Sequence, residues 1–211
     1  MPTRTPKPAK PRAKKKPAAK YHHGDLAQAL RDAALEAIAR DGAERLNLRD
    51  LARRLGVSPA APYRHYADKE ALLRAVGADI AARFQAEVAR AQAEAPPDAI
   101  AQFRAIGIAN VRFAVRYPAH FRVLYLPGVI DDLSAAQTAE ERAMLQQAQD
   151  RGELADLPVD DIALAAGSLV YGLSRLIVDG LLPGPAVTPA RADALAIAMC
   201  HCYLNRHQIQ T

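Results

Sequence analysis

A short run of hydrogen-bond donors lies in the first third of the chain, and these are the residues whose types and spacing could do chemistry. Tyr63, Arg64 and His65 follow directly on small residues, which allow a main chain to approach a partner closely. Such donors on a short helix are typical of contacts with nucleic acid, because they reach phosphates and base edges. Arg64 could reach guanine O6 and N7, the commonest specific pairing, or equally a phosphate.

Two short helices joined by a glycine turn are expected to present these donors. Asn47 is a good helix cap, and a stripe of Leu and Ala predicts a helix over residues 47–55. Gly56 ends that helix, and Ser58 is expected to cap a second helix over residues 59–66, with a proline in its first turn. This outline is a helix-turn-helix, whose second helix enters the major groove of DNA, although generic α-hairpins share it.

One helix before this motif and one after it are expected to complete a small bundle. Apolar residues at helical spacing predict a helix over residues 25–41, which Gly42 ends. Asp68 and Lys69 open a further helix, whose N-terminus attracts phosphate.

The runs Leu48–Ser58 and Tyr63–Leu73 resemble the N-terminal DNA-binding domain of TetR-type (tetracycline-repressor-like) transcriptional regulators. The order Gly-Val-Ser, Tyr-x-His-Tyr, Lys-x-x-Leu is specific to that pattern, and the resemblance covers about residues 21–75. The segments Tyr21–Leu26 and Ala60–Tyr63 are similar to one subgroup of the family.

The resemblance implies a role for each matching residue. Tyr63 and His65 would touch the sugar-phosphate backbone, and Lys69 would bind a phosphate. Either Asn47 or Arg49 would hold the flanking backbone. The residues that would face base edges are Pro59, Ala60, Ala61 and Arg64, and Ser58 completes the expected set of DNA-binding residues.

Two positions of the motif depart from the family pattern. Tyr66 stands where the family prefers Phe, and we interpret it as a core residue rather than a DNA contact. Pro62 stands where an aliphatic residue is usual, and it lacks a main-chain N–H. The second helix should therefore start tight or slightly bent.

Charge divides the 211-residue chain into three parts, although its net charge is only +5. Eight of the 28 Lys and Arg residues lie in residues 1–20, which hold five prolines and no acid, so we expect a disordered basic arm there. The arm could neutralise phosphates or merely aid solubility.

Residues 21–75 form the expected DNA-binding domain. Residues 76–211 hold 11 basic and 15 acidic residues, which is a poor composition for contacting DNA, and form the expected ligand-binding and dimerisation domain.

Residues 76–211 show helical periodicity almost throughout, and no β alternation is sustained. The prediction is an all-α chain of about nine helices, the last two over residues 158–182 and 188–207. The resemblance implies that these two helices pack against their twins in a homodimer; the alternative is that the first of them crosses its own subunit's core. The run Tyr117–Tyr125 is similar to the same subgroup, whereas Tyr171 stands where that subgroup often has His.

A small-molecule site is hypothesised in the second domain, from the apolar composition of ligand sites and the pocket position that the resemblance implies. Ordinary core packing would explain most of its residues too. The candidate lining residues are Phe103, Phe113, His120, Phe121, Tyr125, Met144, Leu169 and Tyr171.

Signatures of catalysis, metals and membranes are weak or missing in the sequence. It contains no Gly-rich phosphate loop, no His-Glu-x-x-His and no Gly-x-Ser-x-Gly, so we expect neither an enzyme nor a cofactor. Cys200 and Cys202 lie two residues apart, on opposite sides of a helix, and so are interpreted as core thiols rather than zinc ligands. Neither a secretory signal nor a membrane span is evident, which favours a cytoplasmic protein without a membrane partner.

These observations predict a ligand-responsive transcriptional regulator. It would be a repressor that binds a palindromic operator in double-stranded DNA as a homodimer, and a small, largely apolar effector would release it. Two alternatives stay open: a constitutive or architectural DNA-binding protein dominated by its basic arm, and a helical ligand-binding protein without operator function.

Overall fold

The computed structural model describes residues 26–126, 131–154, 156–184 and 187–204; for residues 131–138 and 201–204 it describes the backbone only. The expected basic arm lies outside these ranges. The described residues form α-helices and two 3₁₀ turns without strands, which confirms the all-α prediction. The elements are α1 (Leu26–Asp41), η1 (Ala43–Arg45), α2 (Leu48–Leu55), η2 (Pro62–Arg64), α3 (Lys69–Glu94), α4 (Ala99–Arg116), α5 (Pro118–Leu124), α6 (Asp131–Asp150), α7 (Val159–Val178) and α8 (Pro189–Leu204).

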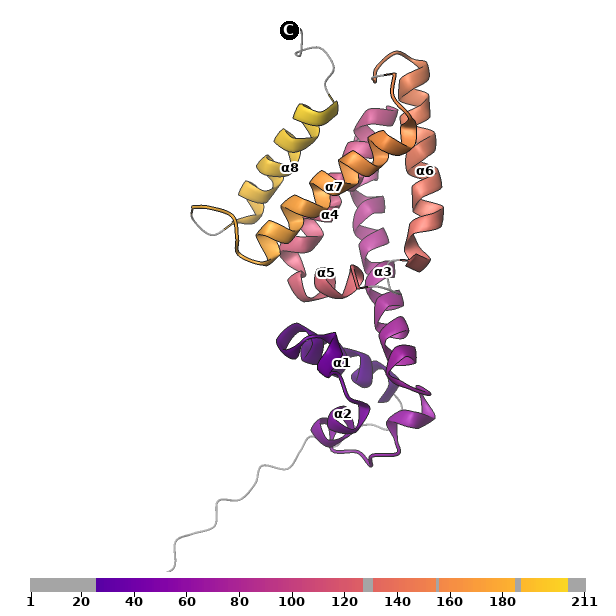
Figure 1. Cartoon of the computed structure of the whole chain (residues 1–211), viewed down its shortest axis with the longest axis vertical. Coiled ribbons are helices and arrows are strands. Elements are labelled where there is room, and N and C mark those ends of the chain that lie inside the picture. The colour runs from indigo at the N-terminus through magenta and orange to yellow at the C-terminus, as the bar shows by residue number, and fades with distance from the viewer. Residues whose placement is uncertain (1–25, 127–130, 155, 185–186, 205–211) are drawn as a thin grey trace, which may run out of the picture.

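The helices arrange as a small N-terminal bundle and a larger bundle, which α3 joins (Figure 1). In the figure α1 and α2 lie in the lower part, α4 to α8 lie in the upper part, and α3 runs from one to the other. With η2 counted as the short helix between α2 and α3, the elements match the expected order of about nine helices.

The ends of α2 follow the local chemistry of their residues. The Asn47 side chain accepts a hydrogen bond from the Arg49 N–H, which caps the helix as predicted. Gly56 adopts φ 71°, ψ 24°, the left-handed conformation that favours glycine, and its N–H closes the helix on two carbonyls.

The expected second helix over residues 59–66 is much shorter than predicted. Only Pro62–Arg64 form a helical turn, and it is 3₁₀. Because Pro62 has no N–H, the Ser58 carbonyl accepts instead from the Ala61 N–H, at 2.9 Å. The expected cap is also wrong: Ala61 takes the N-cap position of this turn, and no side chain caps it, so Ser58 contributes its main chain only.

One hydrophobic core connects the two bundles. Leu30 of α1, Leu72 of α3 and Phe121 of α5 are all fully buried in the same cluster, which also includes Phe113 of α4. The contact between α5 and α1 is part of this shared core, so the two bundles pack directly on each other.

The upper bundle is built around α4, which contacts α3, α5, α6, α7 and α8. Gly107 marks a close helix approach, because a Cβ there would lie 3.2 Å from a methyl group of Val170 on α7. Among the described helices, α7 alone is long and apolar enough to span a membrane by length and composition, and 17% of that stretch is buried inside the protein.

Candidate nucleic-acid interface

The segment from Ser58 to Tyr66, here called the reading turn, is held by two inward residues. Pro62 is buried, and Tyr66 is only 8% exposed. These residues lie four apart, and the Pro62 carbonyl accepts hydrogen bonds from the N–H groups of His65 and Tyr66, both at 3.0 Å. The turn is thus closed on its inner side and presents its remaining residues outward.

The residues proposed to contact DNA lie on that outer side. Tyr63 is 47% exposed, and Arg64 and His65 are exposed beside it. The small residues before them are open to solvent or nearly so: Ser58, Pro59 and Ala60 are exposed, and Ala61 is half-buried. Of the expected reading-turn residues, all but Ala61 are thus exposed, and Ala61 packs partly against the core.

The flanking residues come from the starts of α2 and α3. Asn47 and Arg49 are both exposed, and the Asn47 amide oxygen accepts from the Arg49 N–H at 2.9 Å. Lys69 is half-buried, and its Nζ donates to the Glu44 carbonyl at 3.0 Å. An ammonium group carries three donors, so this bond leaves Lys69 able to bind a phosphate as well.

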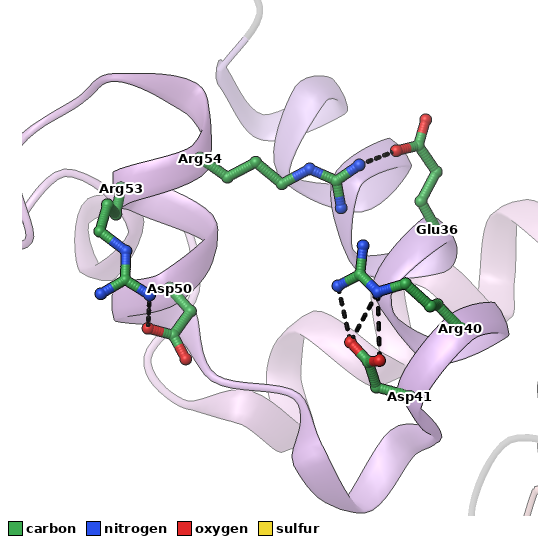
Figure 2. Close-up of polar contacts among 6 residues, drawn as sticks. All are labelled: Glu36, Arg40, Asp41, Asp50, Arg53 and Arg54. Atoms are coloured by element: carbon green, nitrogen blue, oxygen red, sulfur yellow. Dashed lines mark hydrogen bonds and ion pairs between the residues drawn. The ribbon is translucent and has the colours of Figure 1, made fainter.

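Several arginines near this surface are already paired with carboxylates. Figure 2 shows Arg40 with Asp41, Arg53 with Asp50, and Arg54 with Glu36. Within the described ranges, by contrast, neither Arg49 nor Arg64 has an ion-pair partner. Among the residues expected to contact DNA, these two guanidinium groups can therefore bind an external anion without breaking an internal ion pair.

Tyr66 is a core residue, as its interpretation predicted. Its hydroxyl donates to the Ala27 carbonyl of α1 at 3.1 Å and accepts from Arg31 Nη1 at 2.8 Å. Arg31 also pairs through Nε with Asp79 of α3, at 2.5 Å. Hydrogen bonding to Tyr66 is the first cause that raises the pKa of Arg31, against an opposing effect of burial. Sequence reasoning missed Arg31, because its two partners lie 35 and 48 residues away along the chain.

The expected small-molecule residues fall into separate places. Phe113 and Phe121 are buried in the core that joins the bundles, whereas Phe103 and Met144 belong to a second cluster between α4, α6 and α7. Leu169 is 43% exposed on α7.

Three of these aromatic residues do lie together. The Tyr125 ring centroid lies 4.7 Å from those of both Phe121 and Tyr171. Tyr171 therefore contributes a ring to this cluster, and it remains 39% exposed. His120 lies nearby, with its ring 5.3 Å from that of Tyr117.

A buried polar pair underlies the aromatic cluster, and the sequence analysis did not single it out. Asn110 of α4 donates through Nδ2 to the Tyr125 hydroxyl at 2.7 Å, and Ser174 of α7 donates to Asn110 Oδ1 at 3.1 Å. Both Asn110 and Ser174 are buried. Burial raises the pKa of Tyr125, against the opposing hydrogen bond from Asn110. The sequence signal that could have identified this pair is a polar residue on the otherwise apolar, inward face of α4 and of α7.

His120 lies at the edge of this region without a hydrogen bond to its buried Nδ1 atom. Burial lowers the pKa of His120, and the positive charge of Arg83 lowers it further. The imidazole is therefore held neutral near neutral pH.

An open groove of about 480 Å³ lies elsewhere, between α6 and the start of α7. Arg142, Gln146, Leu157 and Asp160 are among its lining residues, and none of the expected small-molecule residues lines it. The groove is thus separate from the aromatic cluster.

The cysteine region offers no metal site within the described residues. No group of three His, Cys, Asp or Glu side chains that could hold an ion occurs in that part of the chain. Cys200 is buried on α8, and burial raises the pKa of its thiol. The side chain of Cys202 lies outside the description.

The glycine-closed α2, the exposed reading turn and Lys69 at the start of α3 form a helix-turn-helix of the kind that DNA-binding regulators carry. Residues 30–76 match the model of the bacterial regulatory proteins of the tetR family. The chain belongs to the TetR family of transcriptional regulators.

Solved structures resemble the chain over most of its length. A protein of unknown function from Rhodococcus sp. RHA1 is 30% identical, with 89% of this chain and 100% of that chain covered and a TM-score of 0.67. A bacterial regulatory protein of the tetR family from Rhodococcus RHA1 is 26% identical, with 82% and 96% covered and a TM-score of 0.65. A ketosteroid transcriptional regulator of Mycobacterium tuberculosis shares the fold at 18% identity, with 88% and 98% covered and a TM-score of 0.67. No curated protein matches the chain.

Proposed function

We propose that this regulator is a cytoplasmic repressor that binds a palindromic operator as a homodimer and is released by a small, largely apolar effector. The observation that carries the proposal is the reading turn, in which Pro62 and Tyr66 are buried while Tyr63, Arg64 and His65 are exposed. A surface of exposed donors on a turn that two inward residues hold is suited to reading a groove.

At the operator, each residue has a distinct task. Tyr63 and His65 contact the sugar-phosphate backbone, Lys69 binds a phosphate from the start of α3, and Asn47 or Arg49 holds the flanking strand. Arg64 faces a base edge with the small residues Pro59, Ala60 and Ala61 beside it, and Ser58 lies at the entry of the turn. The absence of an internal ion-pair partner for Arg64 among the described residues supports its assignment to DNA.

Selection of bound sites from random duplexes tests this assignment. We expect a palindrome whose half-sites follow the two-fold symmetry of a dimer. Arg64→Ala should cost about 1–3 kcal/mol per contacted base pair and relax preference at one position of each half-site. Lys69→Met should weaken all sequences alike and lower the salt slope by about one unit per lost phosphate contact. If bound sites share no sequence, operator recognition is refuted.

The outward face of α7 supports the dimer. Leu164 is 71% exposed and Leu176 is 41% exposed, although both are large apolar residues. A Cβ on Gly167 or Gly172 would meet nothing within 4 Å, so the backbone between those leucines is open to close approach. A neighbouring apolar residue, Ile197 of α8, is 42% exposed. Such a face on the last two helices fits a four-helix contact between two subunits, which would bury these side chains.

The aromatic cluster of Phe121, Tyr125 and Tyr171 supports an effector site in the upper bundle. It combines apolar rings with the Tyr125 hydroxyl, and its α5 residue Phe121 also belongs to the core shared with α1. An effector that displaces α5 would thereby shift the N-terminal helices and lower operator affinity, by no more than its preference for the released state. Titrating a panel of apolar compounds against the operator complex tests this step, and an affinity that no compound changes would refute it.

The basic arm separates this proposal from an architectural binder. We propose the division into a basic arm (1–20), a DNA-binding domain (21–75) and a ligand-binding and dimerisation domain (76–211), with α3 belonging to both domains. A chain without residues 1–20 should keep its sequence preference and lose only part of its salt dependence. Loss of the preference together with the arm would favour the architectural alternative.

A further inference from the structure

Three elements of the N-terminal bundle meet at one guanidinium group. Arg31, on α1, is bonded to the Tyr66 hydroxyl at the end of the reading turn and to the Asp79 carboxylate on α3. Its Nη2 also donates to Gln28 of its own helix. The Arg31 side chain is only 23% exposed, so the group is fixed by its partners more than by solvent.

We propose that Arg31, Tyr66 and Asp79 form a latch that positions the reading turn relative to α3, and that this latch sets operator affinity without touching DNA. The inference rests on the proposed operator function for its affinity readout only. Arg31 is here a positioning residue, because it acts through Tyr66 and Asp79.

The geometry shows what such a latch would do in this chain. The reading turn is a single 3₁₀ turn, which has few internal hydrogen bonds to fix its own orientation. DNA would be held both by Tyr63 on this turn and by Lys69 at the start of α3, so the angle between the two elements must match one duplex. Only the hydroxyl of Tyr66 connects its ring to Arg31, and a Phe at that position would leave the ring buried without the connection.

The size of the effect follows from the fraction of subunits with a competent turn. When that fraction falls, the apparent dissociation constant rises in inverse proportion, and a dimer needs both turns competent. If loss of the hydroxyl leaves about one third of the turns competent, operator binding weakens about tenfold.

The test uses Tyr66→Phe and Asp79→Asn in the full-length chain, with Glu87→Gln as the matched control. Glu87 lies on the same helix as Asp79 and pairs with Arg90 and Arg116, so its substitution removes the same charge without touching the latch. Long-range electrostatics alone would make both acid-to-amide variants bind DNA slightly more tightly. The latch predicts the opposite for Asp79→Asn.

Two readouts decide the outcome. Amide hydrogen exchange at Arg64 and His65 should become about tenfold faster or more in Tyr66→Phe, which loses the bonds of the hydroxyl to Arg31 and to the Ala27 carbonyl. Exchange should accelerate by a smaller factor in Asp79→Asn, whose amide oxygen can still accept from Arg31 but carries no charge, and should not change in Glu87→Gln. The affinity for the operator selected by the wild-type chain should fall about tenfold with an unchanged salt slope, because no phosphate contact is lost.

The results that would overturn the latch are distinct from those that would overturn the function. Unchanged exchange in both variants shows that the bonds do not hold the turn, and faster exchange with unchanged operator affinity shows that they stabilise it without positioning it. Exchange is measured without DNA, so the latch itself is tested even if the wild-type chain selects no operator, a result that would refute only the proposed function.

Discussion

Leu164 offers the sharpest quantitative test of the proposed dimer. This residue is 71% exposed on the outer face of α7 in the single chain. Leu→Ala removes the equivalent of about three methylene groups, each worth about 0.8 kcal/mol on burial. Scaled by the 71% that a partner would newly cover, Leu164→Ala loses about 1.7 kcal/mol in each subunit. A two-fold interface uses the residue twice, so the dimer loses about 3.4 kcal/mol, an increase of about 300-fold in its dissociation constant.

Sedimentation velocity over a dilution series measures this dissociation constant directly. Leu157→Ala is the matched control, because Leu157 is 55% exposed and lines the groove beside α6 instead of the outer face of α7. The control should dimerise like the wild-type chain. Equal dissociation constants for Leu164→Ala and Leu157→Ala would refute the assignment of this face to the interface.

Three further predictions concern stability. Burial, and then the charge of Arg83, lowers the pKa of His120 in the folded chain, so the unfolded chain binds a proton at this residue more readily. The free energy of unfolding should therefore fall as the pH drops below about 6.5, the ordinary pKa of histidine. Urea titrations at several pH values measure this fall, and His120→Phe should remove the contribution of His120 to it. Asn47→Ala should cost about 1 kcal/mol in the same assay, because the first turn of α2 loses its cap, and an unchanged midpoint would contradict the capping role. Asn110→Ala should cost about 1–3 kcal/mol, since it leaves the buried hydroxyls of Tyr125 and Ser174 without their shared partner. Asn110→Asp should not restore full stability near neutral pH: the two hydroxyls can donate to its carboxylate, but the substitution buries a negative charge.

Local features of the fold could be predicted from the sequence because their causes lie within a few residues. The Asn47 cap and the Gly56 ending of α2 depend on neighbouring main-chain groups, and both are confirmed. The proline at position 62 predicted a tight start to the next helix, but its missing N–H shortened that helix to one 3₁₀ turn, which the helical outline of residues 59–66 did not anticipate.

Features that depend on packing could not be predicted in the same way. Apolar spacing identifies which residues are buried, but not which neighbours they meet, so Phe103 and Phe121 were grouped although they lie in different clusters. The bond between Arg31 and Tyr66 joins residues 35 positions apart, and no local pattern encodes such a contact.

The division of the reading turn between buried and exposed residues bears on how new operators could arise. Pro62 and Tyr66 carry the attachment of the segment to the scaffold, whereas Ser58, Pro59, Ala60, Arg64 and their exposed neighbours contribute little to the core. Substitutions at the exposed positions should therefore alter the preferred base sequence at small cost in folding free energy. A lineage of such proteins can then diverge in the genes it controls while its architecture stays the same.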